Sequence, residues 1–364
     1  MPAPFPQPRS GVEVNNPPTG FPAYFNKRRP RVVTADPWAF IRSLAADQLL
    51  KGDATIAGAL IDQAIDFYEA ARYPRLGSKP LLYYYSFLNL VKAALTIHGV
   101  ALPASAFHGI SDPRANQRTR LRLEGQRVLA EKSARDHRRI FPELVKFLGG
   151  DAKEQRYYKV VDLLSQVPSI HRTYTQATGS QSSFIPLREV SVYRDKDNVW
   201  ARIVLRQKDK DVATSLHALR SRQAFRGVFH QVVATSRDEC WFETDTIPAK
   251  KRGIDKGILS LATRIRQYGI YTILTSAGVR FYLSSTTPST RMPQLAAAYA
   301  LVFYLGSVTR YKPDVFDKIT SGGYSWIIEE FLATQPAQFT YSLASHLAGV
   351  DVVRPFAAIE PHAA

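Results

Sequence analysis

An arginine and a histidine four residues apart are the pair in this sequence that most invites a catalytic interpretation. Arg226 and His230 fall in the stretch 213–234, whose pattern predicts a helix, so both would lie on one side of it. A histidine can act as general acid and base while an arginine holds a phosphate, which is the chemistry of an RNA-cleaving site. The pair is therefore a candidate for catalysis, and the alternative that it takes no part in catalysis stays open.

No established catalytic motif accompanies this pair. The sequence has no Walker loop, no GxSxG, no HExxH and no Cys/His zinc spacing. The single cysteine, Cys240, rules out an internal disulfide, and its apolar neighbours predict a buried structural thiol. We therefore expect neither a cofactor nor a metal site.

A strong positive charge is the clearest compositional signal. The 364 residues carry a formal net charge of +17, which fits nucleic-acid binding and also fits simple solubility. The segment 112–139 is the most basic and is expected to be helical; the planar fork of arginine matches phosphate oxygens. A solvated basic face is the alternative. The arginines expected to contact nucleic acid are Arg114, Arg118, Arg122, Arg135, Arg138, Arg139 and Arg310.

An apolar stretch over 78–99 is predicted to be the central helix of the fold. Ser78 and Pro80 suit a helix start and Gly99 suits a stop. Apolar residues surround most of this helix, which is typical of an interior position. A polar side remains, which either satisfies neighbouring groups or faces a cleft. The cleft candidates are Tyr85, Asn89, Lys92 and His98.

The order of patterns predicts an α+β fold that is predominantly helical. Residues 1–34 are proline-rich and predict an extended N-terminal arm. Residues 35–178 predict a helical bundle, opened by Asp36 as helix cap. Residues 179–364 predict an α+β region, with a small antiparallel sheet and C-terminal helices at 324–333 and 339–347.

Neither a signal peptide nor a membrane span is evident. The N-terminus lacks an apolar core region, and no run of about 18 apolar residues occurs. We expect a cytoplasmic protein that does not contact a membrane.

Three segments together resemble a known family. The run KPLLYYYSFLNLVKA (79–93), the pair His108-Gly109, and the run LGSVTRYKP (305–313) are similar to the YaaC-like family. This resemblance covers about residues 38–330 and implies a bacterial cytoplasmic protein with no established reaction. The opening helices also resemble, less closely, HEPN-type bundles, which are common in RNA-directed defence systems. The Arg226–His230 spacing is one residue short of the HEPN pattern, which puts a nuclease activity in doubt.

These observations favour a nucleic-acid-associated protein, binding RNA or DNA, with a role in prokaryotic (anti-phage) defence. One alternative is a protein-interaction or scaffold subunit, or a homo-oligomer, with Tyr83–Tyr85 and Trp326 at the interface. The other is a HEPN-like ribonuclease. Whether the protein is an enzyme is left open.

Overall fold

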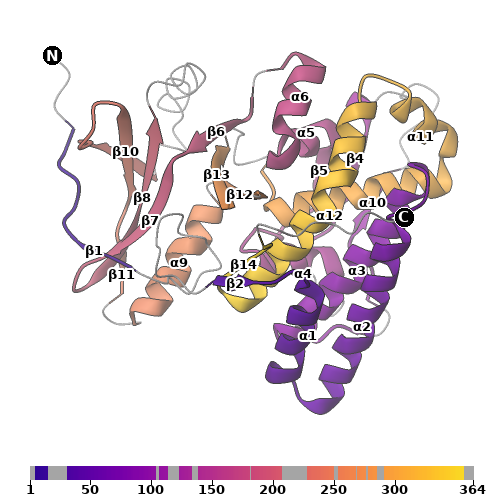
Figure 1. Ribbon diagram of the computed structural model, residues 1–364, viewed down its shortest axis with the longest axis horizontal. Helices are drawn as coiled ribbons and strands as arrows, with labels where there is room; N and C mark the ends of the chain where they lie inside the picture. The colour runs from indigo at the N-terminus through magenta and orange to yellow at the C-terminus, as the bar shows by residue number, and fades with distance from the viewer. Residues whose placement is uncertain are drawn as a thin grey trace. The chain divides into compact units, whose positions relative to one another are not determined.

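A computed structural model gives the fold as two compact units (Figure 1). It describes residues 5–14, 31–103, 106–113, 123–132, 138–180, 182–206, 228–249, 253–267, 269–275, 278–284 and 291–355. Unit 1 comprises residues 1–35, 183–289 and 348–364, and unit 2 comprises residues 36–182 and 290–347. The fold is α+β and mostly helical, as predicted. Among the described residues, no helix is both long and apolar enough to cross a membrane.

Unit 2 opens with the three predicted helices, which lie side by side (Figure 1): α1 (Pro37–Gln48), α2 (Lys51–Ala70) and α3 (Lys79–Ile97). The Asp36 carboxylate accepts hydrogen bonds from the backbone N–H groups of Trp38 and Ala39, both at 3.0 Å, so the predicted cap is confirmed. The predicted start of α3 is also at the right place, because Ser78 is its N-cap residue and Pro80 lies in its first turn, although the Ser78 side chain forms no capping hydrogen bond.

Aromatic rings join these three helices. Trp38 packs edge-on against Tyr68 at 5.3 Å between ring centroids, and Tyr68 packs the same way against Tyr83 at 5.7 Å. Phe67 stacks on Tyr85 at 5.2 Å. Helix α3 is buried along most of its length and ends before Gly99, whose φ of 78° lies in the left-handed region. The predicted interior helix and its glycine stop are confirmed.

The part of the basic segment that the structure describes is not the helix that we predicted. Within 112–139, the described residues form a short 3₁₀ turn, η2 (Leu123–Gly125), and a strand, β4 (Arg127–Ala130). This strand pairs antiparallel with β3 (Ile110–Ser111) and with β5 (Arg156–Lys159). Val128 and Ala130 are buried on alternate positions of β4, and this period of two favours a strand over a helix.

The rest of unit 2 is helical. After β4 come α4 (Ile140–Phe147), α5 (Val160–Ser165), the 3₁₀ turn η3 (Pro168–Ile170) and α6 (His171–Thr178). The unit then continues with α10 (Gln294–Tyr311), α11 (Pro313–Thr320) and α12 (Ser325–Ala348). The two helices predicted over 324–333 and 339–347 are one helix, because Pro336 lies inside α12 without ending it.

Unit 1 is built on antiparallel strands. The largest sheet has the order β1-β7-β8-β10-β9, with β11 also paired to β8. Its strands are β1 (Val12–Glu13), β7 (Glu189–Arg194), β8 (Asn198–Arg206), β9 (Phe229–Val232), β10 (Glu239–Thr244) and β11 (Ile247–Pro248). The hairpin of β7 and β8 belongs to the antiparallel sheet that the sequence predicted. Its turn is held by the Asp195 carboxylate, which accepts hydrogen bonds from the backbone N–H groups of Asp197 and Asn198 at 2.7 Å.

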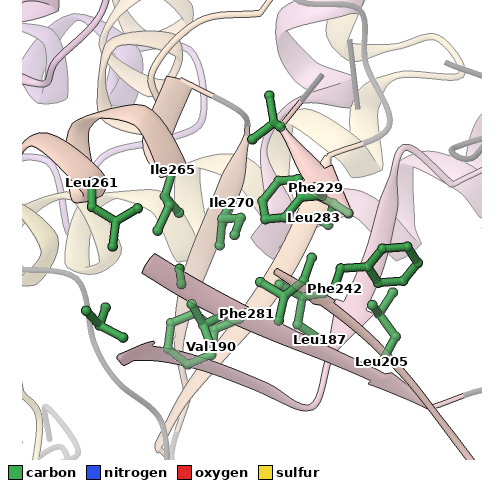
Figure 2. Close-up of a cluster of buried hydrophobic side chains, with 14 of the residues drawn as sticks. Leu187, Val190, Leu205, Phe229, Phe242, Leu261, Ile265, Ile270, Phe281 and Leu283 are labelled. Carbon is green, nitrogen blue, oxygen red and sulfur yellow. The ribbon is translucent and has the colours of Figure 1, made fainter. Parts of the chain in front are cut away.

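Two smaller sheets and helix α9 make up the rest of what the structure describes of unit 1. One sheet has the order β12-β13-β6, from β12 (Ile270–Thr275), β13 (Gly278–Ser284) and β6 (Phe184–Leu187). The other pairs β14 (Asp351–Val353) parallel with β2 (Arg31–Val33). Helix α9 (Ile254–Gln267) supplies Leu261 and Ile265 to a buried apolar cluster with side chains from β7, β8 and β10 (Figure 2). Cys240 belongs to this cluster, so the predicted buried thiol is confirmed.

The division into units differs from the predicted domains at one point. We expected residues 179–364 to form one region, but 290–347 belongs to unit 2 together with 36–182. The reason is the packing of α10 along α3, which brings the C-terminal helices to the bundle. In the predicted arm, residues 5–14 are extended and β1 pairs with the β7 edge of the large sheet.

Candidate functional site

A cavity of about 540 Å³ lies in unit 2 where α3, α10 and the start of β3 meet. We call it the α3–α10 pocket. Its volume lies in the range of sites that hold small molecules. Nine of the residues around it come from the three segments that resembled a family: Leu81, Tyr84, Tyr85, His108, Gly306, Ser307, Arg310, Tyr311 and Lys312. Ile110, Ser111, Asp112 and Phe303 lie just outside those segments.

A glycine lets the two helices approach at the pocket. A Cβ atom built on Gly306 of α10 would lie 3.3 Å from the carbonyl oxygen of Pro80 and 3.3 Å from Cβ of Tyr84, both in α3. Any larger side chain would have to push the backbone of α3 away. The close approach places Tyr84 and Tyr85 of α3 opposite Arg310 of α10.

Arg310 supplies positive charge at the edge of the pocket. Its guanidinium donates from an Nη atom to the Tyr85 hydroxyl at 3.1 Å and lies 5.0 Å from the centre of the Tyr311 ring. Both Arg310 and Tyr311 are exposed to solvent. Among the described residues, Arg310 forms no ion pair, so its charge is available to an anion.

The other charges in the pocket neutralise each other. The Lys312 ammonium donates to the Asp112 carboxylate at 2.7 Å, and both side chains are largely buried. Burial, together with the nearby Asp112 charge, raises the pKa of Tyr304, so this phenol stays neutral. The pocket therefore carries about one uncompensated positive charge, on Arg310.

His108 adds a neutral polar group to the wall. Its Nδ1 atom and the Tyr84 hydroxyl share a hydrogen bond of 2.7 Å. Burial lowers the pKa of His108 and the nearby Lys92 charge lowers it further, while burial raises the pKa of Tyr84. A neutral imidazole can accept a hydrogen bond from the Tyr84 hydroxyl at Nδ1. Its own proton then lies on Nε2, where it can be donated to a ligand.

The lowered pKa of His108 predicts a pH-dependent stability. Below the unfolded pKa of about 6.5, the unfolded chain binds a proton at this residue more readily than the folded one, so folding stability falls as the pH falls. Replacing His108 with glutamine should flatten the decline of the free energy of unfolding between pH 7.5 and 5.5, measured by urea denaturation. His98→Gln, at another exposed histidine of unit 2, is the control. If the free energy of unfolding of His108→Gln falls with pH as steeply as that of the wild type, the lowered pKa of His108 is contradicted.

Only part of the predicted cleft lies at the pocket. Tyr85 contributes to it, whereas Asn89 donates from Nδ2 to the Gln63 side-chain oxygen in α2 at 3.3 Å. Ser86, on the same side of α3, donates to the carbonyl of Ala64 at 2.7 Å. The polar side chains of Ser86 and Asn89 therefore form hydrogen bonds with α2. Lys92 is half-buried outside the pocket, and His98 is exposed and packs edge-on against Phe147 at 4.7 Å.

Three of the arginines predicted to bind nucleic acid lie among the described residues, and each contacts a different group. Arg310 lies at the pocket, Arg138 donates to the carbonyl of Ala101 at 3.2 Å, and Arg139 forms an ion pair with Glu131. The remaining four lie outside the described residues: Arg114, Arg118, Arg122 and Arg135.

The candidate catalytic residues Arg226 and His230 do not lie on one helix. His230 lies in strand β9, where its Nε2 atom and the Asp245 carboxylate are 2.8 Å apart, and Arg226 lies outside the described residues. The helix predicted over 213–234 is therefore wrong at its C-terminal end. Within the described part of the chain, no group of three or more His, Cys, Asp or Glu side chains could hold a metal ion.

Among the residues around the pocket, the sequence predicted Tyr85 as a cleft residue and Arg310 as a phosphate contact. It did not predict the other polar residues of the wall, His108, Ser111, Asp112, Ser307, Tyr311 and Lys312, as site residues. The available signal was their position within or beside the three family-like segments. Nothing local in the sequence shows that these segments meet.

Comparison with known proteins supports the family assignment. A model of the family described as YaaC-like Protein matches residues 28–347, nearly the whole chain, so the chain belongs to this family. Neither the curated proteins nor the solved structures contain a match to it.

Proposed function

We propose that this member of the YaaC-like family is a nucleic-acid-associated binding protein and that its α3–α10 pocket holds a phosphate group of the bound strand. The observation that carries the proposal is the exposed Arg310 guanidinium, oriented by the Tyr85 hydroxyl and without an acidic partner among the described residues. Guanidinium groups match phosphate oxygens in geometry and charge. We further propose that the protein binds nucleic acid as part of a prokaryotic defence system.

The distribution of charge in the sequence also supports the proposal. Sixteen of the 48 basic residues, but only four of the 31 acidic ones, fall in the segments outside the described residues. The segment 114–122 alone has four arginines and no acidic residue, and 250–252 is Lys-Lys-Arg. Short basic segments of this kind neutralise phosphates and release counterions. They would add affinity to the contact that the pocket makes.

Replacing Arg310 with alanine should weaken nucleic-acid binding about tenfold and reduce the slope of log affinity against log salt by about one. The reason is the loss of one phosphate contact. The measurement is fluorescence anisotropy with labelled single-stranded RNA, single-stranded DNA and duplex DNA over a salt series. Arg156→Ala is the matched control, because Arg156 lies on β5 of the same unit and pairs with Glu154 at 3.3 Å. Failure of the wild-type protein to bind any of these at low salt would refute the proposal.

The protein-interaction alternative rests on Trp326 and Tyr85. Tyr83 and Tyr84 are buried inside unit 2, whereas Tyr85 is half-buried and Trp326 on α12 is 48% exposed. An exposed tryptophan is typical of an interface. The ribonuclease alternative has no comparable support, because His230 lies on a strand beside Asp245.

A further inference from the structure

The α3–α10 pocket has a size that bears on what it can recognise. Its volume of about 540 Å³ suits a single small molecule or one monomer of a polymer. A duplex is read by protein elements that enter its grooves, and a base inside a stack cannot enter a pocket unless it is extruded. If the ligand is a nucleic acid, the pocket can therefore take only one nucleotide at a time.

The rim of the pocket carries an aromatic ring and a guanidinium group, which can contact the base and the phosphate of one nucleotide. Tyr311 is 66% exposed, and the Arg310 guanidinium lies over one face of its ring, 5.0 Å from the ring centre, so a base would stack on the opposite face. An exposed aromatic ring gives a base a surface on which to stack, and an adjacent guanidinium can contact the phosphate of the same nucleotide.

The interior of the pocket offers hydrogen bonds between apolar walls. Leu81 and Phe303 are apolar, whereas the Tyr85 hydroxyl, His108, Ser111 and Ser307 are polar. These groups can meet the edge of a base or the hydroxyls of a sugar. The single uncompensated charge matches one phosphate group, since Lys312 is already bonded to Asp112.

We propose that the α3–α10 pocket binds one nucleotide with a single phosphate, which places the phosphate on Arg310 and the base against Tyr311. The ligand is then the phosphorylated end of a single strand or a free nucleoside monophosphate. The first of these sources rests on the function proposed above, and the second does not. In either case, the interior of a strand does not occupy the pocket.

The first experiment uses isothermal titration of the full chain with a nucleoside 5′-monophosphate, the corresponding nucleoside and inorganic phosphate. We expect one site for the monophosphate, with weaker binding of the other two probes. Arg310→Gln should weaken the monophosphate about tenfold and leave the nucleoside unchanged. Tyr311→Leu should weaken both by at least fivefold, because base stacking is lost. Controls on β5 are Arg156→Gln, at a half-buried arginine paired with Glu154, and Tyr157→Leu, at an exposed tyrosine; thermal melting checks that each variant folds.

The second experiment distinguishes the two sources. A 5′-phosphorylated linear strand and a circular single strand of the same sequence compete against the monophosphate. Competition by the linear strand alone supports recognition of a strand end. Monophosphate binding without any nucleic-acid binding supports the free nucleotide as ligand and refutes only the proposed function. Salt-dependent nucleic-acid binding without monophosphate binding refutes the pocket assignment alone. If the circular strand competes with the monophosphate as well as the linear strand does, the pocket assignment is also refuted.

Discussion

Replacing Phe87 with alanine lowers the free energy of unfolding of unit 2 by about 3–5 kcal/mol, the range expected for loss of a fully buried phenyl ring. Phe87 lies in α3 and has no exposed surface. Its ring stacks on that of Phe339 in α12, with centroids 3.9 Å apart and planes 10° apart. The truncation would leave a cavity between two helices that are far apart in the sequence. Urea denaturation followed by circular dichroism measures the loss.

Phe107→Ala is the matched control for this variant. Phe107 belongs to the same unit, but its side chain is 68% exposed, so its truncation should change the stability by less than about 0.5 kcal/mol. The reasoning would be contradicted if the two variants lost similar stability. Because α3 also supplies Tyr84 and Tyr85 to the pocket, we expect Phe87→Ala to weaken ligand binding at temperatures where unit 2 begins to unfold.

Replacing Glu243 with alanine destabilises unit 1 by about 3–5 kcal/mol, because it leaves a buried arginine without its partner. The Glu243 side chain is 1% exposed and accepts from Nε and an Nη atom of Arg202 at 3.0 and 2.6 Å. It also accepts from the backbone N–H of Arg9 at 3.2 Å. The Arg202 guanidinium lies between the rings of Tyr193 and Trp241, 4.3 and 4.8 Å from their centres.

Two comparisons test the origin of this loss by thermal and urea unfolding. Asp245→Ala removes an exposed carboxylate near His230 and should cost at most about 1 kcal/mol. The double variant Glu243→Leu with Arg202→Leu removes both buried charges and should be more stable than Glu243→Ala. A double variant less stable than Glu243→Ala would mean that apolar packing of these side chains, and not the unpaired charge, determines the loss.

The two proposals depend on the same pocket but on different properties of it. Binding of nucleic acid in general requires the charge of Arg310, and basic segments elsewhere in the chain contribute to it. Recognition of a single nucleotide requires the pocket volume and the Tyr311 ring as well. Arg310 and Tyr311 variants therefore give different patterns across nucleotide, nucleoside and polymer ligands.

The sequence by itself determined the elements whose signals are local. The start of α1 at Asp36-Pro37, the buried α3 with its stop before Gly99, and the β7–β8 hairpin all depend on residues a few positions apart. Caps, helical spacing and strand alternation need no distant partner, so they can be read without a structure. The family resemblance was also available, because it rests on three short segments.

The local signals were misleading where packing overrides them. The basic segment was expected to be helical, yet β4 forms because β3 and β5 lie on either side to pair with it. His230 was placed on a helix, yet it pairs within the large sheet as part of β9. Two helices were predicted over 324–333 and 339–347, but a single helix, α12, runs through both ranges and through Pro336.

Only the tertiary structure determined the candidate site. Arg310 meets Tyr85 across 225 positions of the chain, and Lys312 meets Asp112 across 200. Neither contact leaves a trace in the local pattern, because helix and strand periods report which face of an element is buried and not which element buries it. The packing of α10 on α3 at Gly306 decides that these residues surround one pocket.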